Sequence, residues 1–396
     1  MVTVNEALEL VLSQSYDFGN VAVDLLDATG RVLAQDVLAD RNYPPFNRIT
    51  MDGVAINTKA WLNGKRNFKI EGIQAAGQGQ QALLDQDNCI EVMTGAVLPM
   101  GTDAVVPYEL CEILNGSATL NAEVVKPSQN IHPEGIDARQ GDILLSKNKK
   151  ITPAMIGLLA SAGLSKVWVK ALPKIAVCGT GDELVEITQQ PLSHQIRRSN
   201  SYMLTAALLA EGIKAQQYHL RDEPVSMLEQ LTTITNYYDV VLLSGAVSKG
   251  KFDFLPKVLE QIGLQTIFHG VTQRPGKPFL FGKLPTGTFI FGFPGNPVST
   301  FVCYQLYFRR WLSKSLGLSF AAASACLSKP FSFKPDLTLH LLVKLSIQNG
   351  RLIAEPAETS TSGDMIVLSQ TEGILSLPKE RQEFGADEAF DLQMIS

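Results

Sequence analysis

The sequence predicts an α/β protein of several domains, with β-rich segments on either side of the α/β portion. From Leu172 to about Gly317, strand-like runs alternate with helical patterns, which is typical of a largely parallel sheet covered on both faces. Short strands separated by Gly, Asn and Pro run from Ala55 to about Ser128, and the end of the chain alternates apolar and polar residues. Because a chain of 396 residues is too long for a single ordinary hydrophobic core, we expect two to four domains.

The composition is that of a globular protein. Apolar residues make up 45% of the chain and charged residues 18%, which supports sizeable cores, and no run reaches the roughly 18 apolar residues of a membrane span. The first residues resemble no signal peptide, so we expect a cytoplasmic protein. A net charge of −5 argues against a general nucleic-acid surface. An anionic ligand would therefore depend on local cations.

The cysteines and histidines predict no structural metal site. Five cysteines are scattered without a CxxC pair, and the five histidines form no HExxH motif. We expect reduced, mostly buried thiols. Cys178, just before a glycine turn, fits either a core residue or a catalytic thiol.

The first 40 residues begin with an amphipathic helix, followed by strand-like runs at Val21–Val23 and Arg31–Ala34. The paired prolines after Tyr43 exclude a helix there. Asp52 then lies at a turn between two apolar stretches, where an aspartate commonly bonds its own backbone. A functional role for Asp52 is the alternative.

We expect a β-rich domain inserted between residues 40 and 130, because we group the helix that follows Thr152 with the amino-terminal segment. Within it, Thr94 lies at a tight loop between two strands, where it either caps the turn or contacts a ligand. Asp137 follows in a polar, turn-rich segment of the kind that is usually solvated. Thr152 as N-cap, Pro153 as first helical residue and Gly163 at the end predict a short helix.

The α/β portion contains the predicted binding loops. Its expected strands span residues 174–178, 215–220, 239–243, 264–268 and 288–292, with helices that begin near Asn200, Pro224 and Phe252. Ligands of such sheets bind at the carboxyl ends of the strands. Neither a complete GxGxxG after the first strand, where Leu184 replaces the third glycine, nor a P-loop is present.

Three glycine-rich loops follow expected strands, and they read SGAVSKGKFD, RPGKP and GFPGNPVS. Glycines let the backbone approach a ligand, and N–H groups at helix starts attract negative charge. Lys249, Lys251, Arg274 and Lys277 lie in or beside these loops, and Arg197-Arg198 adds further positive charge. The sequence therefore predicts a site for a phosphate-like or oxyanion ligand. Beyond it, apolar–polar alternation in 340–345 and 365–368 predicts strands of a small all-β domain.

Six motifs occur in order along the chain: MDGVA at Met51, MTGAVLPMGTDAVV at Met93, GTGDEL at Gly179, SGAVSKGKFD at Ser244, RPGKP at Arg274 and GFPGNPVS at Gly292. Together they resemble one family, the molybdopterin molybdenumtransferases, which include bacterial MoeA and the gephyrin E domain. The resemblance implies a multidomain α/β protein and an elongated homodimer. Its domains would be an elongated amino-terminal domain (1–40 and 130–171), an inserted β-rich domain (41–129), a three-layer α/β molybdopterin-binding domain (172–318) and a β-barrel-like carboxy-terminal domain (319–396).

The resemblance also implies an activity in molybdenum cofactor biosynthesis. Such a transferase takes adenylylated molybdopterin and molybdate, releases AMP and inserts molybdenum, with Mg²⁺ as cofactor. The site would lie between the α/β domain of one subunit and the inserted domain of the other. The molybdopterin adenylyltransferase is a further suggested partner, whereas no nucleic acid or membrane is expected.

The motif positions assign roles to individual residues. The implied catalytic acids are Asp52, Asp137, Glu183, Asp222 and Asp253, of which Glu183 and Asp222 are the candidate metal ligands. Arg274 and Lys277 offer cations for molybdate, and backbone amides of 245–250 would hold the terminal phosphate of the pterin. The full set of substrate-binding candidates is Thr94, Thr180, Ser244, Gly245, Ser248, Arg274, Lys277, Pro294, Gly295, Asn296 and Pro297.

Some positions depart from the family pattern, and they leave alternatives open. Ala246, Lys249 and Arg274 replace the usual residues of two loops, and His132 and Ile136 stand where an arginine and a glutamate are common. The alternatives are a catalytically degenerate paralogue that acts as a pterin-binding or scaffold protein, a tungsten-inserting homologue, and another hydrolase on the same α/β domain.

Overall fold

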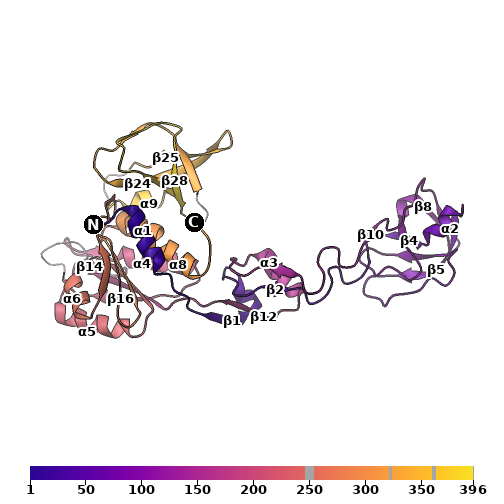
Figure 1. Cartoon of the computed structure of the whole chain (residues 1–396), viewed down its shortest axis with the longest axis horizontal. Coiled ribbons are helices and arrows are strands. Elements are labelled where there is room, and N and C mark those ends of the chain that lie inside the picture. Colours follow the sequence, from indigo (N-terminus) through magenta and orange to yellow (C-terminus); the bar gives the residue numbers. More distant parts are fainter. Residues whose placement is uncertain (246–253, 321–322, 359–362, 396) are drawn as a thin grey trace.

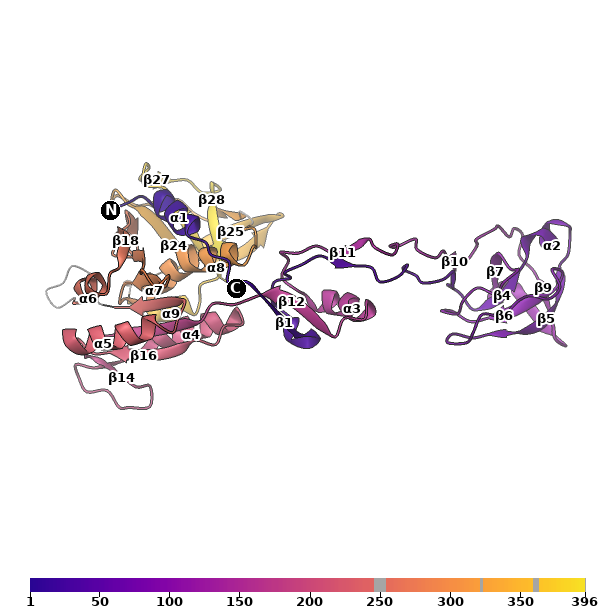
Figure 2. The same cartoon turned by 60° about the horizontal axis from the view of Figure 1, so that its bottom comes forward.

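The molecule is elongated, with sheets at both ends and a narrow connection between them. The computed structural model describes residues 1–245, 254–320, 323–358 and 363–395. The α/β sheet and the carboxy-terminal sheet lie at one end, and the β-rich sheet of residues 53–120 lies at the other (Figure 1). The second view shows the same separation, with two chain segments side by side in the connection (Figure 2).

The α/β sheet has the strand order β16–β13–β17–β21–β20–β18. Its strands β13, β16, β17 and β21 are parallel, whereas β20 is antiparallel to β21 and β18. Consequently β18 runs in the direction of the parallel strands, and its carboxyl end reaches the same edge. The strands are β13 (Ile175–Thr180), β16 (Gln216–Leu220), β17 (Val240–Ser244), β18 (Gln265–His269), β20 (Leu280–Lys283) and β21 (Phe289–Phe293).

Helices cover both faces of this sheet, as predicted. Ile175 and Val177 face one core, and Ala176 and Cys178 face the other, because side chains alternate along a strand. One face packs against α1 (Val4–Ser13), α4 (Ser199–Ala210), α7 (Pro297–Cys303), η3 (Tyr304–Phe308) and α8 (Arg309–Ser315); the other packs against α5 (Pro224–Thr235) and α6 (Leu255–Gln261).

Cys178 belongs to this core. Its side chain is fully buried, and burial raises the pKa of the thiol because the interior disfavours a thiolate. A thiol that stays protonated is a poor nucleophile. The structure therefore favours the core reading over a catalytic cysteine.

The first helix packs in a different place from the one expected. Thr3 and Glu6 form a capping box at its start, and Ala7 and Val11 are fully buried in the core that also contains Trp311. The sequence-based division grouped this helix with the elongated domain. Its apolar face lies instead on the α/β portion, because the complementary apolar surface is there.

Two separate segments of the chain build the connection. Strand β1 (Asn20–Asp24) pairs antiparallel with β12 (Lys166–Lys170), next to η1 (Leu25–Ala28) and the predicted helix α3 (Pro153–Ser161), which Thr152 caps. Farther along, β2 (Val37–Leu38) pairs with β11 (Ile143–Leu145), and β3 (Arg48–Ile49) pairs with β10 (Ile131–His132). Paired strands limit the bending of this connection better than a single chain would.

The β-rich sheet at the far end has the order β7–β4–β6–β5–β9–β8. Gly53 begins β4 beside β7, and a Cβ at this position would overlap the carbonyl oxygen of Val106 and lie 2.8 Å from its carbonyl carbon. The elements are β4 (Gly53–Ile56), α2 (Thr58–Leu62), β5 (Asn67–Gln74), β6 (Cys89–Val92), β7 (Ala104–Pro107), η2 (Tyr108–Leu110), β8 (Cys111–Leu114) and β9 (Ser117–Leu120).

The carboxy-terminal strands form a closed sheet, because β24 pairs with both β25 and β26. The short strand β19 (Gln273–Arg274), from the α/β segment, joins it parallel to β24. The strands are β22 (Ala323–Leu327), β24 (Thr338–Gln348), β25 (Arg351–Pro356), β26 (Gly373–Leu377) and β28 (Ala389–Met394), with the pair β23 (Phe331–Ser332) and β27 (Glu383–Phe384) beside them.

One predicted strand of this domain is wrong. Residues Met365–Leu368 form the short helix α9, not a strand. The side chain of Asp364 accepts hydrogen bonds from the N–H groups of Ile366 and Val367, which is an N-cap. A short apolar run cannot distinguish the two structures by periodicity, and the cap decides it.

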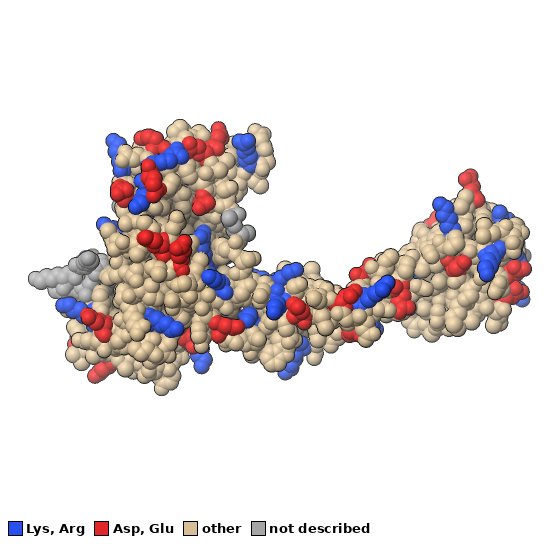
Figure 3. Space-filling model, viewed as in Figure 1, with Lys and Arg blue, Asp and Glu red and all other residues tan. Residues whose placement is uncertain are grey.

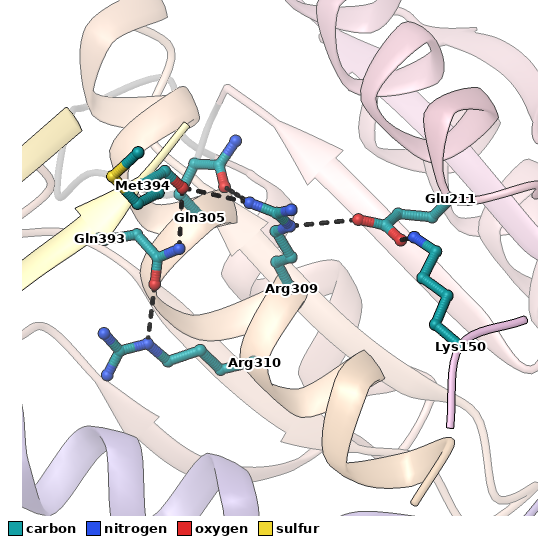
Figure 4. Close-up of polar contacts among 7 residues, drawn as sticks. All are labelled: Lys150, Glu211, Gln305, Arg309, Arg310, Gln393 and Met394. Atoms are coloured by element: carbon teal, nitrogen blue, oxygen red, sulfur yellow. Dashed lines mark hydrogen bonds and ion pairs between the residues drawn. The ribbon is translucent and has the colours of Figure 1, made fainter. Parts of the chain in front are cut away.

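A polar network joins the α/β portion to its two neighbours (Figure 4). The Glu211 carboxylate accepts from Lys150 Nζ at 3.1 Å and from Arg309 Nε at 3.1 Å. Arg309 also donates to the Met394 carbonyl oxygen at 3.3 Å. Glu211 thereby links the end of α4 to the connection through Lys150 and, through Arg309, to the carboxy-terminal domain.

Acidic and basic side chains are interspersed on the face shown in Figure 3. Within the ranges that the structure describes, none of the helices has the length and apolar character needed to cross a bilayer. Because charges of both signs are mixed on the face shown, binding of an anion must be attributed to individual groups and not to a charged surface.

We expect Gly53→Ala to destabilise the β-rich sheet by roughly 1–3 kcal/mol or more, because the methyl group has no space beside the β7 backbone. Denaturant unfolding of the full chain measures the effect. Gly79→Ala is the matched control, since its added Cβ meets no atom within 4 Å. Equal stability of the two variants would contradict the packing argument.

His340, on β24, makes stability depend on pH. Its side chain is buried, and burial, helped by nearby Arg310, lowers its pKa from 6.5 to about 3. Between these values the unfolded chain binds a proton at His340 and the folded chain does not. The free energy of unfolding should therefore fall by about 1.4 kcal/mol for each pH unit below 6.5. Denaturant unfolding of the wild type and of His340→Gln at several pH values between 7 and 5 measures this. The free energy of unfolding should fall less steeply with pH in the variant, and an equal fall in both proteins would contradict the prediction.

Candidate functional site

A cavity of about 900 Å³ lies at the carboxyl ends of the parallel strands. The pairing of Gly179 with Ser244, and of Ser244 with Phe293, brings the ends of β13, β17 and β21 to one level. The loops that leave these strands therefore meet. Among the predicted site residues, the cavity brings together Thr180, Glu183, Asp222, Ser244, Gly245, Pro294, Gly295, Asn296 and Pro297.

Close backbone contact at Gly245 shapes the cavity. Gly245 has a φ of +100°, and a Cβ there would lie 2.7 Å from Thr180 Oγ1 and 2.9 Å from the Thr180 carbonyl oxygen. Its N–H donates to the Phe293 carbonyl oxygen at 3.1 Å. Only glycine fits this turn, which joins the three strand ends.

Two carboxylates, Glu183 and Asp222, line the cavity. They come from neighbouring strands, because β13 pairs in register with β16. The Asp222 N–H donates to Asp182 Oδ1 at 3.2 Å, and His219 Nε2 lies 2.9 Å from the Gly181 carbonyl oxygen. These contacts hold the two loops together, so both acids face the same ligand space.

The start of α4 contributes polar groups that the sequence analysis did not select. Ser199, Asn200 and Ser201 line the cavity. Asn200 Nδ2 donates to Ser244 Oγ at 2.9 Å and to the Gly295 carbonyl oxygen at 2.7 Å. The N–H groups in the first turn of this helix have no partner within it and favour an anion. The Ser-Asn-Ser run at a helix start was the available signal.

The two arginines at the same edge of the sheet, Arg197 and Arg198, already contact neighbouring acceptor groups. Arg198 approaches the Glu186 carboxylate to 2.6 Å, and Arg197 Nε donates to the Ile187 carbonyl oxygen at 3.0 Å. Both residues line the cavity. Arg198 therefore acts as a paired charge that orders residues 186–198 more than as an unpaired cation.

Arg274 and Lys277 lie in a second cavity of about 420 Å³. Its walls are the RPGKP loop and residues of β24, and Pro278 lines both cavities. The loop follows β18, whose carboxyl end is at the same sheet edge as the first cavity. The two cations are thus separate from the carboxylates but adjacent to them.

Asp52 and Thr94 lie on the β-rich sheet, at the opposite end of the molecule from both cavities (Figure 1). The Thr94 N–H donates to Asp52 Oδ1 at 2.6 Å. Hydrogen bonds from Thr94 lower the pKa of the Asp52 carboxyl, so it is ionised at neutral pH and exposed to solvent. Asp52 can therefore stabilise the turn by this hydrogen bond and still present its carboxylate to a ligand.

Asp137 also lies outside the cavities. It contacts His132 Nε2 at 3.1 Å, in the part of the connection nearest the β-rich sheet. Within a single chain the structure therefore separates Asp52, Thr94 and Asp137 from Glu183 and Asp222.

Most of the SGAVSKGKFD loop falls outside the described residues. This holds for Ser248 and Asp253, for Lys249 and Lys251, for Ala246 and for the expected phosphate-binding amides of residues 246–250.

Two carboxylates in the first cavity are the candidate ligands for a divalent cation. Across the described ranges, no group of three or more His, Cys, Asp or Glu side chains is arranged to hold a metal. Mg²⁺, however, commonly uses one or two carboxylates together with substrate phosphates and water. Glu183 and Asp222 in one cavity fit this smaller requirement.

Two family models match the chain. Residues 2–163 match the MoeA N-terminal region (domain I and II). Residues 176–314 match a probable molybdopterin binding domain. The second range includes β13, β17, β21 and the start of α4, which surround the first cavity.

Relatives match over most or nearly all of the chain. A molybdopterin molybdenumtransferase of Synechocystis is 41% identical, over 98% of this chain and 99% of the relative. One from Haemophilus influenzae is 34% identical, over 77% and 76%.

The structure of a molybdopterin biosynthesis MoeA protein from Pyrococcus horikoshii OT3 is also similar. It superposes with a TM-score of 0.85, at 26% identity and full coverage of both chains. Sequence similarity and fold thus agree along the whole chain, which belongs to the MoeA family of molybdopterin molybdenumtransferases.

Proposed function

We propose that this chain inserts molybdenum from molybdate into adenylylated molybdopterin and releases AMP. Family membership identifies it as a transferase of molybdenum cofactor biosynthesis. The observation that carries the proposal is the pair of adjacent cavities that share Pro278. One offers a helix start, hydroxyl groups and two carboxylates, and the other offers two cations.

The first cavity suits the phosphate-bearing substrate. Backbone N–H groups at the start of α4 and the Ser244 hydroxyl, which Asn200 orients, can bind phosphate oxygens. The second cavity suits molybdate, because Arg274 and Lys277 supply positive charge for a tetrahedral dianion. Reactants bound in these two cavities would lie on either side of the shared wall, which would favour transfer between them.

Mg²⁺ is part of this proposal. Glu183 and Asp222 would hold it together with phosphate oxygens of the substrate. When bound, it would neutralise charge on the phosphoanhydride that is broken. Carboxylates at the same edge can also orient a water molecule.

A second copy of the chain completes the proposed site. Asp52 and Thr94 lie beside the β-rich sheet at one end of the molecule, and the cavities lie at the other end (Figure 1). The two residues are therefore too far from the cavities of their own chain to act there. A symmetric homodimer would bring the β-rich sheet of one chain to the cavities of the other. Asp52 and Asp137 are catalytic candidates on this basis. We also propose a cytoplasmic location for the protein and the molybdopterin adenylyltransferase as its partner.

The purified chain should release AMP when it is incubated with adenylylated molybdopterin, molybdate and Mg²⁺. Asp52→Asn should lower the rate roughly 100-fold or more, since it removes a candidate general acid–base group. Glu112→Gln, an exposed acid on β8 of the same sheet, serves as the matched control and should retain the wild-type rate. Tungstate in place of molybdate tests the choice of metal.

Absence of AMP release from the wild type, together with retained pterin binding, would support a scaffold role and refute the proposed reaction. Equal rates for the wild type and Asp52→Asn would remove Asp52 from the mechanism.

Mixed dimers test the shared site. Asp52→Asn and Glu183→Gln should each be inactive alone. In a random mixture, half of the dimers contain both variants and one intact site, so about a quarter of the wild-type activity should return. AMP release from chains refolded or coexpressed together measures this. No recovery, despite dimers by light scattering, would place both residues in one chain's site.

A further inference from the structure

The RPGKP loop is built into the carboxy-terminal barrel. Gln273 and Arg274, which form β19, pair in parallel with Thr338 and Leu339 of β24. The Thr338 N–H donates to the Thr272 carbonyl oxygen at 3.1 Å. Residues of the barrel strand β24 also form a wall of the second cavity. The cations of the loop therefore depend on contacts with two domains.

Gln273, with no exposed surface, lies at the centre of these contacts. Its Nε2 is 3.2 Å from the Gly276 carbonyl oxygen, inside the loop. Because that oxygen can only accept, the amide nitrogen must face it, and Oε1 then faces the other way. Oε1 accepts from the Tyr307 hydroxyl of η3, and it lies 3.2 Å from His340 Nε2 of β24.

These partners define the state of His340. Gln273 Oε1 has no proton to give, so His340 Nε2 must carry the hydrogen. Nδ1, 3.0 Å from Ser376 Oγ, is then the acceptor for that hydroxyl. The low pKa of this buried side chain agrees with a neutral ring. The chain of hydrogen bonds thus runs from β26 through β24 and Gln273 to the loop.

Tyr307 supports the same arrangement from the α/β side. Its ring is buried and stacks on Phe279, which follows the loop, with ring centroids 4.7 Å apart. Both Tyr307 and His340 therefore restrain one amide group, from opposite domains. A buried amide held by donors and an acceptor resists displacement, since breaking any one bond leaves a polar group unpaired.

We propose that Gln273, Tyr307 and His340 are positioning residues that set the place of Arg274 and Lys277, so that the barrel tunes binding of the oxyanion. This inference rests on the proposed function of the second cavity as the molybdate site. The three side chains do not react; they fix the loop that carries the two cations. Changes in the network should then affect the oxyanion and not the pterin substrate.

Steady-state AMP release, with molybdate and adenylylated molybdopterin varied in turn, tests this. Tyr307→Phe and His340→Leu should each raise the KM for molybdate about three- to tenfold, the effect of losing one hydrogen bond. The kcat at saturating molybdate and the KM for adenylylated molybdopterin should stay close to the wild type. His340→Gln retains a donor near the position of Nε2 and should restore the KM to within about twofold.

Leu375→Ala is the control for general weakening of the barrel, because Leu375 is fully buried in the barrel core and has no part in the network. It should lower stability without changing the KM for molybdate. An unchanged KM in Tyr307→Phe and His340→Leu, or an equal rise in Leu375→Ala, would overturn the inference.

Hydrogen exchange of residues 270–280 gives a readout that does not need activity. Tyr307→Phe and His340→Leu should speed exchange in this segment, whereas Leu375→Ala and His340→Gln should not. If the wild type releases no AMP but exchange changes in this pattern, the proposed reaction fails and the positioning role stands. Unchanged exchange in the network variants refutes the positioning role, whatever the activity.

Discussion

The register of the parallel strands β13, β17 and β21 is the constraint on which the first cavity depends. Pairing of Gly179 with Ser244, and of Ser244 with Phe293, ends the three strands at one level. The loops must then leave from adjacent points, and only a residue without Cβ fits at Gly245. A shift of one residue in this register would turn the apolar side chains of a strand to the wrong core and separate the loops.

The second constraint is the length of the connection between the two ends of the molecule. Short paired strands hold two chain segments side by side, and they keep the β-rich sheet away from the cavities (Figures 1 and 2). The candidate site residues of one chain therefore lie in two separate places. This separation within one chain is the observation behind our proposal that a second copy completes the site.

Polar contacts between domains set the remaining geometry. Glu211 connects α4 to Lys150 of the connection and to Arg309, which reaches the carboxy-terminal strand (Figure 4). Gln273 connects the cationic loop to β24 and η3. The Gln273 network uses buried groups, where each hydrogen bond is worth more than it is in water, whereas the Lys150–Glu211 contact is exposed. The carboxy-terminal barrel is thus a structural part of the second cavity.

The sequence by itself determined five of the six strands of the α/β sheet, the helices α4, α5 and α6, the glycine loops and the family, because apolar periodicity, caps and motif order are local properties; it did not predict β20. It also selected Thr180, Glu183, Asp222 and Ser244, which the fold brings into one cavity. Only the tertiary structure decided that α1 packs on the α/β portion, that Asn200 belongs to the cavity and that Gln273 meets His340. Those facts depend on contacts between distant segments, which no local pattern encodes.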